Sequence, residues 1–124
     1  MASTLPLNTF KTITWNLTTD LLSVYTAPVG ITSIILMAQI SNIDTTPLTH
    51  TVTASHYDGT FSTNLVLNFP IAANDAASVL TGKLILEAGQ SVQLSCDSFF
   101  GGSPSSGDGT SMQAVLSILE TSNQ

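Results

Sequence analysis

The sequence predicts an all-β protein, an antiparallel β-sandwich or jelly-roll-like fold with about seven to nine strands. Apolar and polar residues alternate along several short segments, which is the period of half-buried strands. Turn residues such as Gly, Pro, Asn and Asp separate these segments, and none of them keeps a helical period. At 124 residues the chain fits one domain. We expect an N-terminal arm over residues 1–8, where Pro6 blocks regular pairing, and the sandwich over residues 9–124.

The longest apolar stretch, Ile31–Ile40, predicts a central strand that is apolar on both faces. Its core-facing row is expected to be Ile34, Leu36, Ala38 and Ile40. Ile35 and Met37 would then cover part of the opposite face. The preceding Ala27–Gly30 predicts a type II turn with Pro28 in its second position.

Two shorter strands come before this stretch. Phe10–Leu17 alternates, and its apolar row predicts a half-buried strand: Ile13, Trp15 and Leu17. Leu21–Thr26 predicts the second strand, which ends at the turn.

A hairpin is predicted after the central strand. Leu48–Tyr57 alternates strictly, with one face expected inward: His50, Val52, Ala54 and His56. The other face is expected to be solvated: Thr49, Thr51, Thr53 and Ser55. Asp58-Gly59 is a strong hairpin turn, and the return strand is expected over Thr60–Phe69. The inward row of that return strand should be Leu65, Leu67 and Phe69.

The second half of the chain predicts further strands. Pro70–Ala77 reads as a crossing loop, and Val79–Leu86 as a strand with a kink at Gly82. After a tight turn at Glu87–Gln90, the strand Ser91–Asp97 has an apolar row: Val92, Leu94 and Cys96. Ser98–Thr110 is the longest irregular segment.

The last strand, Met112–Thr121, carries apolar residues on both faces and is expected at a sheet edge. Its inward row is either Ala114, Leu116 and Ile118 or Val115 and Leu119. Only one row of an edge strand can enter the core of a two-layer sandwich, so the other row is left for a partner. The expected contact residues combine the second of these rows with the threonine face: Val115, Leu119, Thr49, Thr51 and Thr53.

Charge is scarce in this chain. Charged residues make up 8 % of the sequence, and the net charge is −6 with Lys11 and Lys83 as the cations. Two lysines cannot neutralise a phosphate backbone or an anionic membrane, which argues against both partners. The N-terminus lacks the pattern of a secretion signal and Cys96 is the single cysteine, so synthesis in a reducing cytoplasm is expected.

The residues that could carry chemistry do not form a recognisable site. His50 and His56 are six residues apart on a strand, roughly 20 Å, so one metal ion cannot bind both. Cys96 falls in an inward row, as an inert thiol would. Most acidic residues lie in turns, and Asp97 with Asp108 lacks the spacing of a calcium loop. The glycine-rich segment 98–110 has no lysine of a phosphate loop. We therefore expect no catalytic residue, metal or cofactor.

Three aromatic residues, Trp15, Tyr25 and Tyr57, leave sugar stacking open as an alternative. The chain would then be a carbohydrate-binding module of a host-recognition device.

Three segments carry a family resemblance: VYTAPVGITSIILMAQISN at 24–42, NFPIAANDAASVLTGKLILEAGQSVQL at 68–94, and VLSILETS at 115–122. They are similar to segments of small virion proteins of tailed phages, particularly T4-like phages of marine bacteria and cyanobacteria. The resemblance implies a β-sandwich structural component of the virion without catalytic residues, and it departs at the long Ser98–Thr110 loop. A capsid decoration protein is the first expectation, and a neck, tail or baseplate attachment protein is the alternative.

The resemblance also implies partners and a location. The partners would be major capsid or tail proteins, and the chain would leave the host cytoplasm as part of the virion. Self-association is expected from the sparse charge and the doubly apolar last strand. A homotrimer is favoured by analogy with the local three-fold positions of capsid lattices.

Overall fold

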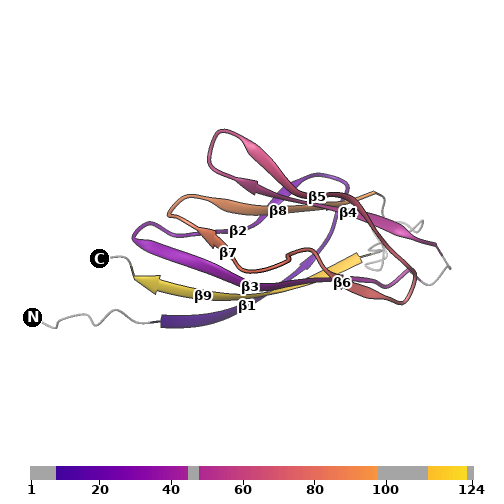
Figure 1. Cartoon of the computed structure of the whole chain (residues 1–124), viewed down its shortest axis with the longest axis horizontal. Coiled ribbons are helices and arrows are strands. Elements are labelled where there is room, and N and C mark those ends of the chain that lie inside the picture. Colours follow the sequence, from indigo (N-terminus) through magenta and orange to yellow (C-terminus); the bar gives the residue numbers. More distant parts are fainter. Residues whose placement is uncertain (1–7, 45–47, 98–111, 123–124) are drawn as a thin grey trace, which may run out of the picture.

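The computed structural model describes residues 8–44, 48–97 and 112–122. These residues form nine strands and no helix, which confirms the all-β prediction. The strands, labelled in Figure 1, are β1 (Asn8–Asn16), β2 (Leu22–Thr26), β3 (Ile31–Asn42), β4 (His50–Tyr57), β5 (Ser62–Ile71), β6 (Ala76–Ser78), β7 (Leu84–Leu86), β8 (Ser91–Cys96) and β9 (Met112–Ser122). No helix of the described part is long and apolar enough to cross a membrane.

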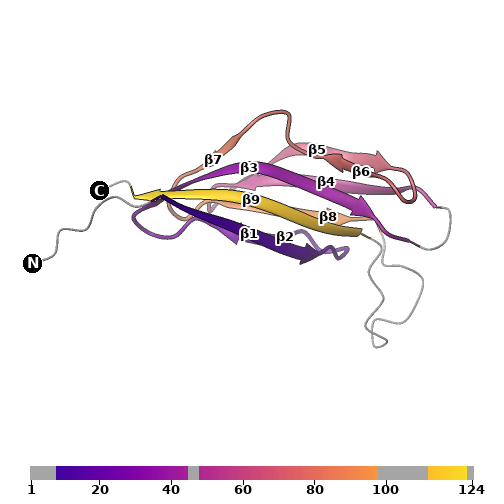
Figure 2. The ribbon, with the colours of Figure 1, turned by 90° about the horizontal axis from the view of Figure 1, so that it is seen from below.

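The strands form two antiparallel sheets that are stacked as a sandwich (Figure 1). Sheet A has the order β1-β9-β3-β6, and β7 pairs with β3 beside β6. Sheet B has the order β2-β8-β4-β5. Figure 2 looks onto sheet A and shows β1, β9 and β3 side by side, with β6 and β7 beyond β3. The predicted antiparallel sandwich is therefore present.

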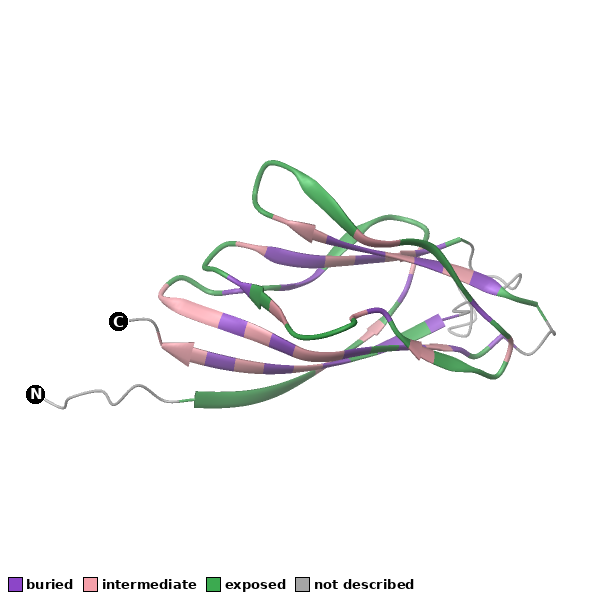
Figure 3. Cartoon of the chain, in the orientation of Figure 1, coloured by how far each residue is buried: buried purple, intermediate pink, exposed green. Residues whose placement is uncertain are grey.

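The core lies between the two sheets, where buried residues alternate with more exposed ones along β3, β8 and β9 (Figure 3). On β8 the predicted inward row is confirmed, because Val92, Leu94 and Cys96 are all buried. On β9 the structure decides between the two rows that the sequence left open. The buried row contains Ala114, Leu116 and Ile118.

The last strand is not at a sheet edge, contrary to the expectation. β9 is paired with β1 on one side and with β3 on the other. Val115 is 38 % exposed and Leu119 is partly exposed, so this second row lies on the outer face of the sheet.

The predicted inward row of the central strand is wrong in its first half. Ile35 is fully buried, whereas Ile34 and Leu36 are partly exposed. The pairing of β3 with β9 shifts by one residue between Ile35 and Met37. A bulge of one residue moves all following side chains to the opposite face, so the buried row changes from odd to even residues. The prediction therefore holds after the bulge, where Ala38 and Ile40 are buried.

The turn before β3 is shifted by one residue from the prediction. The amide of Ile31 donates to the carbonyl of Pro28 over 3.1 Å, and Gly30 has φ +79°. These values place Pro28 first and Gly30 third in the turn, where type II geometry needs positive φ. Ala27 is not part of this turn, because its N–H and its carbonyl are both hydrogen-bonded to the turn before β8.

The predicted inward row of the hairpin's return strand is largely wrong. Leu65 packs against the core, but Leu67 is 63 % exposed and Phe69 is 37 % exposed. β5 makes two register shifts against β4, and Asn68 has φ +52°. The shifts break the alternation on which the prediction depended, and Ile71 is the buried residue at the end of β5.

The segment predicted as one strand over Val79–Leu86 contains a single short strand, β7, after an irregular connection. β6 precedes this segment and β7 ends it, and both pair with β3. Leu86 is buried and Ile85 is 58 % exposed, as the alternation predicts.

Other predicted features are confirmed wholly or in part. The inward row of β1 is correct, since Ile13 and Trp15 pack on the core. That of β4 is correct over its first part, where Val52 and Ala54 are fully buried, and wrong at its end, where Ser55 of the expected solvated row is fully buried and His56 is partly exposed. The pairing of β4 with β5 shifts between Ala54 and Ser55, which breaks the alternation there. β1 begins at Asn8, the last residue of the predicted arm; the rest of the arm and Ser98–Thr110 lie outside the described residues.

Candidate functional site

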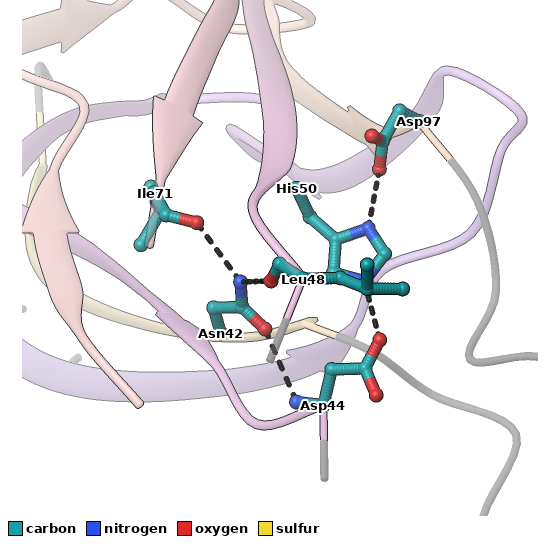
Figure 4. Close-up of polar contacts among 6 residues, drawn as sticks. All are labelled: Asn42, Asp44, Leu48, His50, Ile71 and Asp97. Carbon is teal, nitrogen blue, oxygen red and sulfur yellow. Dashed lines mark hydrogen bonds and ion pairs between the residues drawn. The ribbon is translucent and has the colours of Figure 1, made fainter. Parts of the chain in front are cut away.

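A buried polar network joins the ends of three strands at one end of the sandwich (Figure 4). Asn42, the last residue of β3, is 1 % exposed. Its side-chain amide donates to the carbonyl oxygens of Leu48 and Ile71, over 3.0 and 2.9 Å. Its Oδ1 accepts a hydrogen bond from the amide of Asp44 over 3.1 Å. Asn42 thus connects the end of β3 to the segment before β4 and to the end of β5, and it holds Asp44 close to the start of β4.

His50, the first residue of β4, lies between two carboxylates (Figure 4). Its Nε2 is 2.6 Å from Oδ2 of Asp44, and its Nδ1 is 2.9 Å from Oδ1 of Asp97, which follows β8. The side chains of His50 and Asp44 are 6 % and 2 % exposed, and that of Asp97 is 38 % exposed. We call Asp44, His50 and Asp97 the His50 cluster.

The electrostatics of the cluster favour a charged imidazole ring. Burial lowers the pKa of His50, but the hydrogen bonds to Asp44 and Asp97 outweigh it, and the pKa is raised above its ordinary value of 6.5. Ionised carboxylates only accept hydrogen bonds, whereas an imidazolium donates from both nitrogens. The protonated ring therefore satisfies both partners.

The geometry of the His50 cluster leaves little room for chemistry. A general base or a metal ligand needs a nitrogen lone pair, and both ring nitrogens of His50 face carboxylates. Across the described ranges, no group of three or more His, Cys, Asp or Glu residues is placed to hold a metal ion. What the arrangement can do is fix the ends of β3, β4 and β8 relative to one another.

A second buried polar network lies at the opposite end of the sandwich. The hydroxyl of Tyr25 on β2 donates to Oε2 of Glu120 on β9, and it is 2.7 Å from the hydroxyl of Ser33. Nζ of Lys11 on β1 is 3.3 Å from the same carboxylate. Burial and the hydrogen bond to Glu120 raise the pKa of Tyr25 to about 12. This network joins both sheets.

The sequence missed the His50 cluster, although it placed His50 on an inward row. His50 and Asp97 are 47 residues apart, and Asp44 is one of the acidic residues that the sequence places in polar connections. An imidazole on an inward row needs polar partners. Acidic residues that directly follow predicted strands were the candidates for these partners, and this was the available signal for the cluster. His56 is separate from the cluster: its Nε2 is 3.1 Å from Oε1 of Gln90.

The remaining candidates are scattered. Cys96 is 6 % exposed in the core. The three aromatic residues considered for sugar binding lie on three strands, β1, β2 and β4; Tyr25 is buried, and Trp15 and Tyr57 are partly buried.

The predicted contact residues lie on two different outer faces. Thr51 and Thr53 are partly buried on β4 of sheet B, and Thr49 is exposed just before β4. Val115 and Leu119 lie on the outer face of sheet A. The structure thus separates the threonine group from the apolar pair.

The outer face of sheet A carries no charged side chain among its paired, described residues. Residues paired across a sheet share a face, so the registers define it. The face consists of Asn8, Phe10, Thr12, Thr14 and Asn16 of β1; Gln113, Val115, Ser117, Leu119 and Thr121 of β9; Thr32, Ile34, Met37, Gln39 and Ser41 of β3; Ala76 and Ser78 of β6; and Ile85 of β7.

Comparisons with known proteins add a similarity in structure. No protein-family model and no curated protein matches this chain. Among solved structures, the chain is similar to one from Bacillus endospore appendages, described as a novel family of disulfide-linked pili. The identity is 13 % and the TM-score 0.49, and the match covers 98 % of this chain and 93 % of that chain.

Proposed function

We propose that this chain is a non-enzymatic structural subunit of a tailed-phage particle. The observation that carries the proposal is the uncharged outer face of sheet A. The surface of a free-standing protein normally carries interspersed charged side chains, which limit association. A broad face without them suits a subunit whose surface is covered by neighbours in an assembly.

The internal use of the buried ionisable groups supports the non-enzymatic part. The His50 cluster and the Tyr25–Glu120 pair connect elements of the fold, and their polar atoms face one another. A catalytic group has to reach a substrate with a lone pair or a proton. In these two networks the proton donors and acceptors are hydrogen-bonded to one another.

The assignment to a phage particle depends on the sequence resemblance. That resemblance favours a capsid decoration protein bound to the major capsid protein, and a neck, tail or baseplate position is the alternative. A three-fold assembly matched to the capsid lattice stays a prediction from analogy.

Location in the particle is the decisive test. Particles of the phage that encodes the chain would be purified and separated into heads and tails, and each fraction would be searched for its peptides by mass spectrometry. We expect the peptides in the head fraction, and cryo-electron microscopy would then show the sandwich on the capsid. Peptides in the tail fraction would support the alternative position, and absence from both fractions would overturn the proposal.

A glycan array separates the carbohydrate-binding alternative. Saturable binding of a sugar that is lost on Trp15→Ala or Tyr57→Ala would favour it. The positions of the aromatic residues on different strands give it no support.

A further inference from the structure

An apolar row crosses the outer face of sheet A at right angles to its strands. Phe10 on β1 is opposite Leu119 on β9, Leu119 is opposite Ile34 on β3, and Ile34 is opposite Ile85 on β7. We call these four residues the apolar stripe. Phe10 and Ile85, at its two ends, are 73 % and 58 % exposed, and the two central residues are partly exposed. The stripe therefore presents large apolar side chains to solvent along the full width of the sheet.

We propose that the outer face of sheet A binds a second copy of this chain in a two-fold arrangement, with the two apolar stripes in contact. The inference deepens the proposed function, because it names one partner of the structural subunit and the surface that binds it.

Charge favours a second copy as the occupant of this face. The chain has a net charge of −6, so two copies repel each other wherever their acidic residues meet. Among the described residues, the exposed acids lie in turns and loops outside the face: Asp20, Asp58, Asp75, Glu87 and Asp97. On the outer face of sheet A, two copies can approach without placing like charges opposite each other. Lys83 and Glu87, of opposite sign, flank β7 in the chain and would belong to a polar rim.

The size of the face is sufficient for a weak but specific pair. β1 contributes nine paired residues, and the face is four strand positions wide. At ~3.3 Å per residue and ~4.8 Å per strand, the flat area is about 570 Å² per copy, or about 1,100 Å² for a pair. Specific interfaces begin at about 1,000–1,200 Å². We therefore expect association in the micromolar to submillimolar range.

The register fixes the arrangement that uses the whole face. A two-fold axis parallel to the strands overlays the two faces completely and places stripe on stripe. Phe10 of one copy then meets Ile85 of the second, and Leu119 meets Ile34 of the second. Apolar side chains contact apolar side chains across the whole row, as in the aligned packing of two twisted sheets. Such an isologous contact closes as a dimer, in contrast to the trimer expected by analogy.

The test compares three single substitutions in the purified chain. Phe10→Asp and Ile85→Asp each place a negative charge at one end of the stripe. Phe61→Asp is the matched control, because Phe61 is 71 % exposed and lies in the turn between β4 and β5 of sheet B. All three replace an exposed apolar side chain by one carboxylate. Circular dichroism and denaturant midpoints would establish that each variant is folded.

Sedimentation velocity over a range of concentrations would give the dimer dissociation constant. We expect wild type to reach twice the 13.0 kDa mass of one chain. Phe10→Asp and Ile85→Asp should each weaken the dimer more than about tenfold, because each places an unpaired charge in the apolar contact at one end of the stripe. Phe61→Asp should leave it unchanged.

The inference would be overturned by a monomeric wild type at submillimolar concentration, by a wild-type trimer, or by equal weakening on Phe61→Asp. Weakening by Phe10→Asp but not by Ile85→Asp would also overturn it, since association would then run along the β1 edge. The measurement uses the chain alone, so a dimer that is absent from phage particles would retract only the proposed function.

Discussion

Ile35 and Ile118 lie opposite each other on β3 and β9, and neither side chain is exposed to solvent. The next pair along these strands is Met37 with Ser117, so Leu36 has no opposite residue on β9. This single extra residue decides which half of the apolar stretch 31–40 faces the core.

Substitution of Ile35 and Leu36 by alanine should separate the two residues. We expect Ile35→Ala to lower the free energy of unfolding by about 2–5 kcal/mol, because it removes buried methyl groups and leaves a cavity. Leu36→Ala should cost at most about 1 kcal/mol, because that side chain is partly exposed at the bulge. Urea denaturation of both variants provides the measurement. Equal losses would contradict the position of the bulge.

Where the strands keep a strict two-residue alternation, the sequence predicted the core correctly. Val92, Leu94 and Cys96 on β8 form such a case, because polar residues stand between them. On β3, four consecutive apolar residues from Ile34 to Met37 fit either face, so alternation could not show which of them point into the core. On β5 the register shifts have no recognisable signal in the sequence.

The candidate site was less accessible to sequence analysis than the fold. The pairing of β4 with β8 brings His50 to Asp97, which is 47 residues away in the sequence, and Asn42 holds Asp44 on the other side of the ring. The outer face of sheet A depends in the same way on strand order. Val115 and Leu119 were recognised as an apolar pair, but their continuation into Phe10 and Ile85 requires the registers.

The two glycines Gly89 and Gly82 should respond oppositely to alanine. Gly89 has φ +85° in the turn before β8, and no atom lies within 4 Å of an added Cβ. Gly89→Ala should therefore destabilise the fold by about 1 kcal/mol through backbone strain alone. Gly82 has equal space and no positive φ, so Gly82→Ala should be neutral or stabilising by up to ~1 kcal/mol. Thermal or urea unfolding of both variants would show the difference in sign, and a stable Gly89→Ala variant would contradict the turn geometry.

Removal of the Tyr25 hydroxyl should weaken the network that joins the two sheets. Tyr25→Phe deletes the hydrogen bonds to Glu120 and Ser33 and leaves a buried carboxylate with fewer donors. We expect a loss of about 1–3 kcal/mol in the free energy of unfolding. Tyr57→Phe is the control, because the hydroxyl of Tyr57 donates to the exposed carbonyl of Gly59. The free energy of unfolding of Tyr57→Phe should stay within about 0.5 kcal/mol of wild type. Similar losses for the two variants would mean that Glu120 does not depend on Tyr25.

The His50 cluster should make stability fall as pH rises above about 6.5, the ordinary pKa of histidine. The pKa of His50 is raised in the folded state, so the folded protein holds the proton more tightly than the unfolded chain. The stabilisation is fully present below the unfolded pKa of about 6.5 and is lost as pH rises through the folded value. Urea unfolding across this range should show the decrease. Asp58 does not contribute to this decrease, because hydrogen bonds from the amides of Phe61 and Thr60 lower its pKa, which is already acidic.

The two histidines provide the comparison for this pH dependence. His56→Gln should keep the decrease, since His56 contacts Gln90 and not the cluster. His50→Gln should abolish it and should also cost about 3–5 kcal/mol, because the buried carboxylate of Asp44 loses its cation. If His50→Gln does not fold, Asp97→Asn gives the same information in a milder form, since the Asp97 side chain is partly exposed and its charge helps to hold the proton. We expect a shallower decrease in that variant than in wild type. A pH profile that is identical in wild type and Asp97→Asn, or a decrease that His56→Gln removes, would show that His50 is not the residue responsible.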